Sequence, residues 1–105
     1  MVLPAAFVRQ SELAKEIDHV RQGLRPEIVD LRYSLGEDHT GDPSIFFDIV
    51  LPDNAIDNDP TLRRSRHLQD DIEQALRPLE NWGVLPYCTF VLLSHDVAFR
   101  EKKVA

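Results

Sequence analysis

Alternation of apolar and polar residues predicts three strands along the chain. From Val29 to Leu35 the apolar and polar residues alternate, which is the period of a strand with one buried face. The run from Ile45 to Leu51 is apolar on both faces except at Asp48, and the run from Tyr87 to Ser94 also has apolar residues on both faces. Residues 36–43 are rich in Gly, Asp and Pro, which favours a loop that joins the first two strands into a hairpin.

Two further segments have the helical period. The first is predicted to be a helix from about Ser11 to Gln22, with Ser11 as its N-cap and Gly23 at its C-terminal end. Its buried stripe consists of Leu13, Ile17, Val20 and Leu24. The second begins at Asp59 and Pro60, an acid at the N-cap followed by a proline at the first helical position, and Pro78 is expected to end or kink it. Its expected buried stripe is Leu68, Ile72, Ala75, Leu76 and Leu79.

The resulting order, α-β-β-α-β, predicts an α+β fold of the ferredoxin-like type, with a three-stranded sheet and two helices on one face. The right-handed crossover rule would place the third strand beside the first and leave the second at an edge. An edge strand as apolar as residues 45–51 is an aggregation hazard unless something covers it.

With 105 residues the chain suits one domain, residues 1–105. We expect an ordered core from about residue 11 to residue 96, between a flexible N-terminal segment and a charged C-terminal tail.

The predicted sheet has more apolar surface than two helices can cover. The face opposite the helices would expose Phe46, Val50, Phe90 and Leu92. Burying each such side chain stabilises a protein by about 1.5–3 kcal/mol, so a patch of this kind is seldom left in water. The N-terminal segment through Val8 or a second copy of the chain would cover it. Eight residues are too few to cover a sheet face, which favours a homodimer.

Charge and composition exclude several classes of function. The net charge of −6 and the pI near 5.1 argue against a nucleic-acid or anionic-membrane binder, which needs a basic surface. No apolar run approaches the roughly 20 residues of a membrane span. The single cysteine, Cys88, cannot form an internal disulfide, and the N-terminus does not resemble a signal peptide, so a cytoplasmic location is expected.

Acidic residues are concentrated between residues 27 and 59, which hold nine acids and one base. One interpretation is a pair of solvated loops. The other is a surface offered to a partner with a basic surface, with Asp38 and Asp42 in contact. His39 lies in the same loop, where turn chemistry and binding of a divalent cation are both open.

Motifs for catalysis are missing from the chain. It has no G-x-S-x-G elbow and no phosphate-binding loop, and Cys88 falls inside a predicted strand, where a buried thiol is usually inert. The cluster of Arg63, Arg64 and Arg66 suits either an anion or pairing with the acidic loops. We therefore expect no enzymatic activity and no catalytic residues.

Three segments resemble the cytoplasmic domain of cation diffusion facilitator transporters. They are the helix at Arg64–Leu76, the strand end at Leu92–Asp96 and the first strand at Leu31–Gly36, and the resemblance extends over roughly residues 12–96. It implies a homodimer with zinc bound near the dimer interface, for which His67, His95 and Asp96 are the candidate ligands. The block from residue 36 to residue 47 is also similar to one in small uncharacterised bacterial proteins.

These observations favour a non-enzymatic, self-associating cytoplasmic module that serves protein interaction or acts as an accessory subunit. The alternative is a metal- or ligand-responsive regulatory domain that binds zinc through His67 and His95. Apart from that zinc ion, we expect no cofactor.

Overall fold

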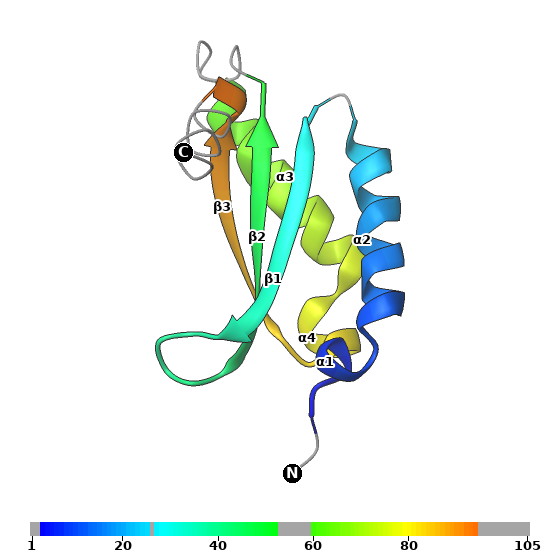
Figure 1. The fold of residues 1–105 in the computed structure, drawn as a ribbon. Helices are drawn as coiled ribbons and strands as arrows, with labels where there is room; N and C mark the ends of the chain where they lie inside the picture. The colour runs from blue at the N-terminus through cyan, green and yellow to red at the C-terminus, as the bar shows by residue number, and fades with distance from the viewer. Residues whose placement is uncertain (1–2, 26, 53–59, 95–105) are drawn as a thin grey trace, which may run out of the picture.

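The computed structural model describes residues 3–25, 27–52 and 60–94, and for residues 60–66 only the backbone. The described part has an α+β fold with one three-stranded mixed sheet (Figure 1). The elements, in chain order, are α1 (Ala5–Val8), α2 (Gln10–Leu24), β1 (Asp30–Glu37), β2 (Pro43–Leu51), α3 (Pro60–Leu76), α4 (Pro78–Trp82) and β3 (Leu85–Leu92). No helix in these ranges is long and apolar enough to cross a membrane.

The central strand of the sheet is β2, which pairs antiparallel with β1 and parallel with β3. The order that the crossover rule would give, with the third strand beside the first, is therefore not the observed one. The composition of β2 explains its place, because Ile49 and Val50 point to opposite faces and are 0% and 1% exposed. Between two neighbours, this apolar strand has both of its backbone edges paired, and the hazard of an apolar edge at β2 is removed.

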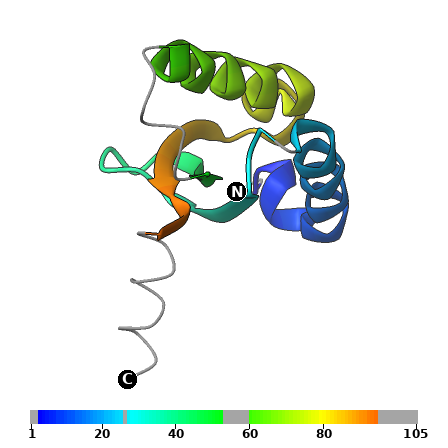
Figure 2. The same ribbon diagram turned by 90° about the horizontal axis from the view of Figure 1, so that it is seen from above.

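Both long helices lie on the same face of the sheet, as the two views show (Figures 1 and 2). Alternate residues of β1 and β2 meet the apolar stripes of α2 and α3 in a single core. The helical stripes are confirmed at their central positions. The most deeply buried members of the core, each at most 2% exposed, include Leu13, Ile17, Leu31, Ile45, Phe47, Ile49, Leu68, Ile72 and Leu76.

The N-terminal segment belongs to the packed structure. The side chain of Ala6 in α1 is fully buried, and Phe7 packs against the core, so the core begins before residue 11. This segment contacts α4 on the helix side and does not extend over the opposite sheet face (Figure 1). The first long helix begins at Gln10 with Arg9 as its N-cap, so Ser11 lies inside the helix and not at its cap.

The second helical region breaks where Pro78 was expected to end or kink it. Arg77, between α3 and α4, has a φ of 46°, in the left-handed region, and Pro78 is the first residue of α4. This change of direction rotates the residues that follow away from the stripe of α3. Leu79 is 60% exposed and Ala75 is also exposed, so their predicted burial is wrong, while Trp82 is 3% exposed and takes a place in the core.

Candidate functional site

The sheet face opposite the helices holds only part of the predicted apolar patch. Phe46 of β2 lies beside Tyr87 of β3 on this face, and Val50 lies beside Val91. Phe46 is half-buried and Tyr87 is 39% exposed. Val50, however, is 1% exposed, so it adds nothing to an accessible apolar surface.

Phe90 and Leu92 lie on the helix side of the sheet. Their neighbours on β2 are Ile49 and Leu51, and both side chains pack half-buried against the core. The prediction that they share a face with Phe46 is therefore wrong. The physical reason is the pairing of β3 with β2, because a change of register by one residue exchanges the two faces of a strand.

Polar residues divide the opposite face into two halves. Asp48 at the centre of β2 is exposed and lies between Arg32 of β1 and Thr89 of β3. Ser34 is exposed on the same face of β1. This surface is therefore a mixed one, with its apolar part concentrated towards β3.

An aromatic pair occupies the part of this face nearest the hairpin loop. The rings of Phe46 and Tyr87 are stacked with centroids 5.5 Å apart and planes 20° apart. The Phe46 ring also extends over Gly36, where an added Cβ would lie 3.7 Å from Cε2 of the phenylalanine. This pair links β2 to β3 through side-chain contacts, and the Phe46 ring lies beside β1 at Gly36.

The acidic hairpin loop is organised around Asp38. Its Oδ1 accepts hydrogen bonds from the Thr40 N–H at 2.9 Å, the Thr40 hydroxyl at 2.6 Å and the Asp42 N–H at 3.0 Å. Its Oδ2 accepts a hydrogen bond from the Tyr87 hydroxyl at 2.7 Å. These donors lower the pKa of the Asp38 carboxyl well below its usual range, and the same carboxylate raises the pKa of Tyr87.

Asp38 thus holds the loop in shape and ties it to β3. The loop projects away from the helices (Figure 1), with His39 and Asp42 exposed. A role for Asp38 and Asp42 in contacting a basic partner stays a prediction.

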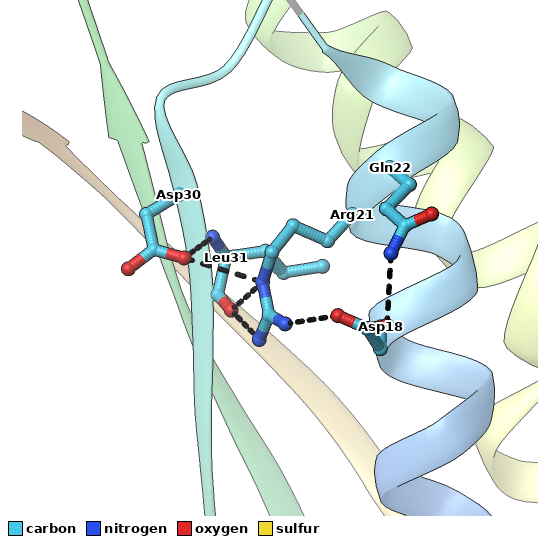
Figure 3. A network of polar contacts seen from close by, with 5 residues as sticks. All are labelled: Asp18, Arg21, Gln22, Asp30 and Leu31. Atoms are coloured by element: carbon cyan, nitrogen blue, oxygen red, sulfur yellow. Dashed lines mark hydrogen bonds and ion pairs between the residues drawn. The ribbon is translucent and has the colours of Figure 1, made fainter.

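The free edge of β1 is blocked by side chains (Figure 3). The Leu31 carbonyl accepts hydrogen bonds from Nε and Nη2 of Arg21, at 3.0 and 2.6 Å, and the Leu31 N–H donates to Oδ1 of Asp30 at 2.8 Å. Arg21 is itself held by Asp18 at 2.9 Å and by Asp30 at 3.2 Å. Another strand pairing at this position would have to displace these contacts.

The other edge of the sheet, β3, has no charged residue in its sequence LPYCTFVL. Side chains of β3 are half-exposed on both faces: Cys88, Phe90 and Leu92 on the helix side, and Val91 with the more exposed Tyr87 on the other. Burial, with a smaller contribution from Glu73, raises the pKa of the Cys88 thiol to about 11, so this thiol is neutral near pH 7 and a poor nucleophile.

The predicted zinc ligands fall only partly within the described residues. His67 is exposed on α3, whereas His95 and Asp96 lie outside the described residues, as do the side chains of Arg63, Arg64 and Arg66. Within residues 3–25, 27–52 and 67–94, no three His, Cys, Asp or Glu side chains cluster closely enough to hold a metal ion. The zinc site stays a prediction.

Comparison with known proteins gives no relative. No protein-family model matches the chain, and neither the curated proteins nor the solved structures include a significant match. The resemblance to cation diffusion facilitator domains therefore stays a prediction.

Two contacts in the structure were not predicted from the sequence. The interaction of Tyr87 with Asp38 joins residues 49 positions apart, and the interaction of Arg21 with Leu31 depends on how α2 packs against β1. The one feature of the sequence that could have indicated the first contact is Tyr87, an aromatic residue with a hydroxyl at the start of the third predicted strand.

Proposed function

We propose that this chain is a non-enzymatic, self-associating protein-interaction module, and that β3 is the strand through which it assembles. The observation that carries the proposal is the contrast between the two edges of the sheet. Charged residues and the Arg21 network protect β1, whereas β3 is uncharged and half-exposed on both faces. Natural edge strands are usually protected by charge, and unprotected ones pair with other strands.

The composition of β3 is that of a strand with neighbours on both sides. Strands that are buried on both faces are mostly apolar on both faces, and β3 follows this pattern except at Thr89. A second copy paired along β3 would bury more of Phe90 and Leu92 on one face and of Tyr87 on the other. Burial of apolar area of this kind drives association in most protein dimers.

The backbone of β3 also suits pairing on its free side. The N–H and C=O of Leu31 point away from β2, and backbone groups of successive residues in a strand point alternately to its two sides. When this alternation is followed through the two strand registers, the N–H and C=O of Cys88 and Phe90 lie on the free side of β3. Pro86 has the same orientation, so its missing N–H removes no bond to β2. Two copies related by a two-fold axis would join their three-stranded sheets antiparallel into one continuous sheet.

The test is the oligomeric state of two matched variants, measured by light scattering over a dilution series. Thr89→Lys places a charge on β3, and Ser34→Lys places the same charge on β1, on the same sheet face and also at an exposed position. We expect the wild-type chain to dimerise at micromolar concentration. Thr89→Lys should raise the dimer Kd by about fivefold or more, because lysine on an edge strand opposes pairing, while Ser34→Lys leaves the Kd unchanged.

Two results would contradict the proposal. A wild-type chain that stays monomeric over the whole series would refute self-association. An equal loss of dimer in both variants would show that the chain associates through the sheet face opposite the helices and not through the edge of β3. Both variants change exposed residues, so their unfolding midpoints should stay close to that of the wild type.

A further inference from the structure

A groove on the helix side of the sheet lies where the end of α3, the short helix α4 and the start of β3 meet. Its volume is about 480 Å³, which is enough for one or two side chains of a partner. We propose that this groove binds a protein segment in which an aliphatic side chain is flanked by arginine or lysine. This proposal does not depend on the self-association proposed above, although one lining residue, Pro86, belongs to β3.

The apolar part of the groove comes from Leu79, together with Pro78 and Pro86. Leu79 is 60% exposed, although the periodicity of the preceding helix would bury it. The left-handed conformation of Arg77 turns the chain and brings Leu79 to the surface, where it lines the groove together with Pro86. An exposed leucine in a groove that two prolines also line can bury an aliphatic side chain of a partner.

The polar part of the groove is acidic. Among the described residues that line it, Asp70, Glu73 and Glu80 are acidic and Arg77 is the single cation. Nη1 of Arg77 lies 3.6 Å from Oε2 of Glu80, and both side chains are more than half exposed, so this ion pair is weak and open to exchange. The excess of negative charge selects a cationic occupant and opposes a phosphorylated or acidic one.

The wall that α4 forms is held rigidly. Pro78 and Trp82 are buried, the Asn81 N–H donates to the Arg77 carbonyl at 2.8 Å, and the Asn81 side chain donates to the Leu76 carbonyl at 3.4 Å. A groove whose wall is already ordered loses little conformational entropy when a ligand binds. The groove is therefore preformed for a short segment.

The proposal is tested with three short peptides and the isotope-labelled chain, by following amide chemical shifts in NMR spectra. The probe is acetyl-Arg-Arg-Leu-Arg-Arg-amide. One control peptide replaces its leucine with serine, and the other replaces its arginines with glutamate. We expect the probe to shift amides between residues 70 and 86 at concentrations up to roughly millimolar, with weaker shifts from the serine peptide and none from the glutamate peptide.

Matched variants separate the groove from the acidic surface as a whole. Glu73→Gln and Leu79→Ser should each weaken binding of the probe about fivefold or more, because each removes one half of the recognition. Two control variants lie outside the groove. Glu16→Gln changes an exposed glutamate on α2, and Val8→Ser changes a residue on α1 that is 67% exposed, close to the 60% of Leu79. Both should leave binding of the probe unchanged.

Three results would overturn the proposal. The first is an absence of shifts with the probe, and the second is equal binding of the leucine and serine peptides. The third is a set of shifts centred on the hairpin loop at residues 38–42, which would place the basic partner on the acidic loop and not in the groove. None of these results bears on the dimer, which the dilution series measures separately.

Discussion

The same substitution, glycine to alanine, should have opposite effects at two helix ends. Gly83 ends α4 with a φ of 67°, and its N–H donates to the Leu79 carbonyl at 3.2 Å. A Cβ added there would lie 3.3 Å from Cβ of Pro4. Gly23 lies in the last turn of α2, where an added Cβ has no neighbour within 4 Å.

The expected magnitudes follow from backbone conformation. A residue with a Cβ in the left-handed region loses about 1–2 kcal/mol relative to glycine, and the contact with Pro4 adds to this because the N-terminal segment must move. Gly83→Ala should therefore lower the free energy of unfolding by about 1–3 kcal/mol. Gly23→Ala should raise it by about 0.5–1 kcal/mol, because alanine is the better helix former and meets open space.

Urea unfolding of both variants and the wild type, at one protein concentration, measures the two effects. The slope of the free energy against urea should stay constant, so that a change of midpoint reports a change of stability. Equal chain concentration is needed because association stabilises the folded state. The reasoning is refuted if Gly83→Ala is as stable as the wild type, or if Gly23→Ala is less stable.

Two further predictions concern the polar contacts of β1 and the hairpin. Arg21→Met removes the donors to the Leu31 carbonyl and should lower the free energy of unfolding by about 1–2 kcal/mol. Arg25→Met, at an exposed position, should have little effect, and an equal loss in both variants would contradict this prediction. Because folding lowers the pKa of Asp38, its contribution is complete above the pKa of the unfolded chain, near 4, and is lost as the pH falls towards the folded pKa. When the pH is lowered from 7 to below 4, Asp38→Asn should therefore lose less free energy of unfolding than the wild type. Urea midpoints at several pH values measure this difference. If the two chains lose stability in parallel, Asp38 does not have this role.

The sequence by itself determined the kinds of secondary structure and most of the buried helix positions. The spacing of Leu13 and Ile17, and that of Leu68 and Ile72, places each pair on one face of a helix whatever that helix packs against, because the backbone geometry is local. The break at Pro78 is equally local, because proline has no N–H to donate to the hydrogen bonds of a continuing helix. These features are confirmed.

Strand order needed the tertiary structure. Alternation within Val29–Leu35 and Tyr87–Ser94 is the same whether the third strand lies beside the first or the second. The run Ile45–Leu51 did contain a signal, because its two apolar faces conflict with an edge position. The strand order depends on how α3 and α4 pack across the sheet, because that packing places β3 next to β2.

The same limit applies to the candidate surfaces. Alternation showed that Phe90 and Leu92 share one face of their strand, but only the register of β3 against β2 decides that this face meets the helices. Leu79 lies at the surface because Arg77 adopts a left-handed conformation, and the pattern of apolar residues does not predict that conformation. Periodicity is a property of neighbouring residues, whereas the identity of the covering element is set by contacts between residues far apart in the chain.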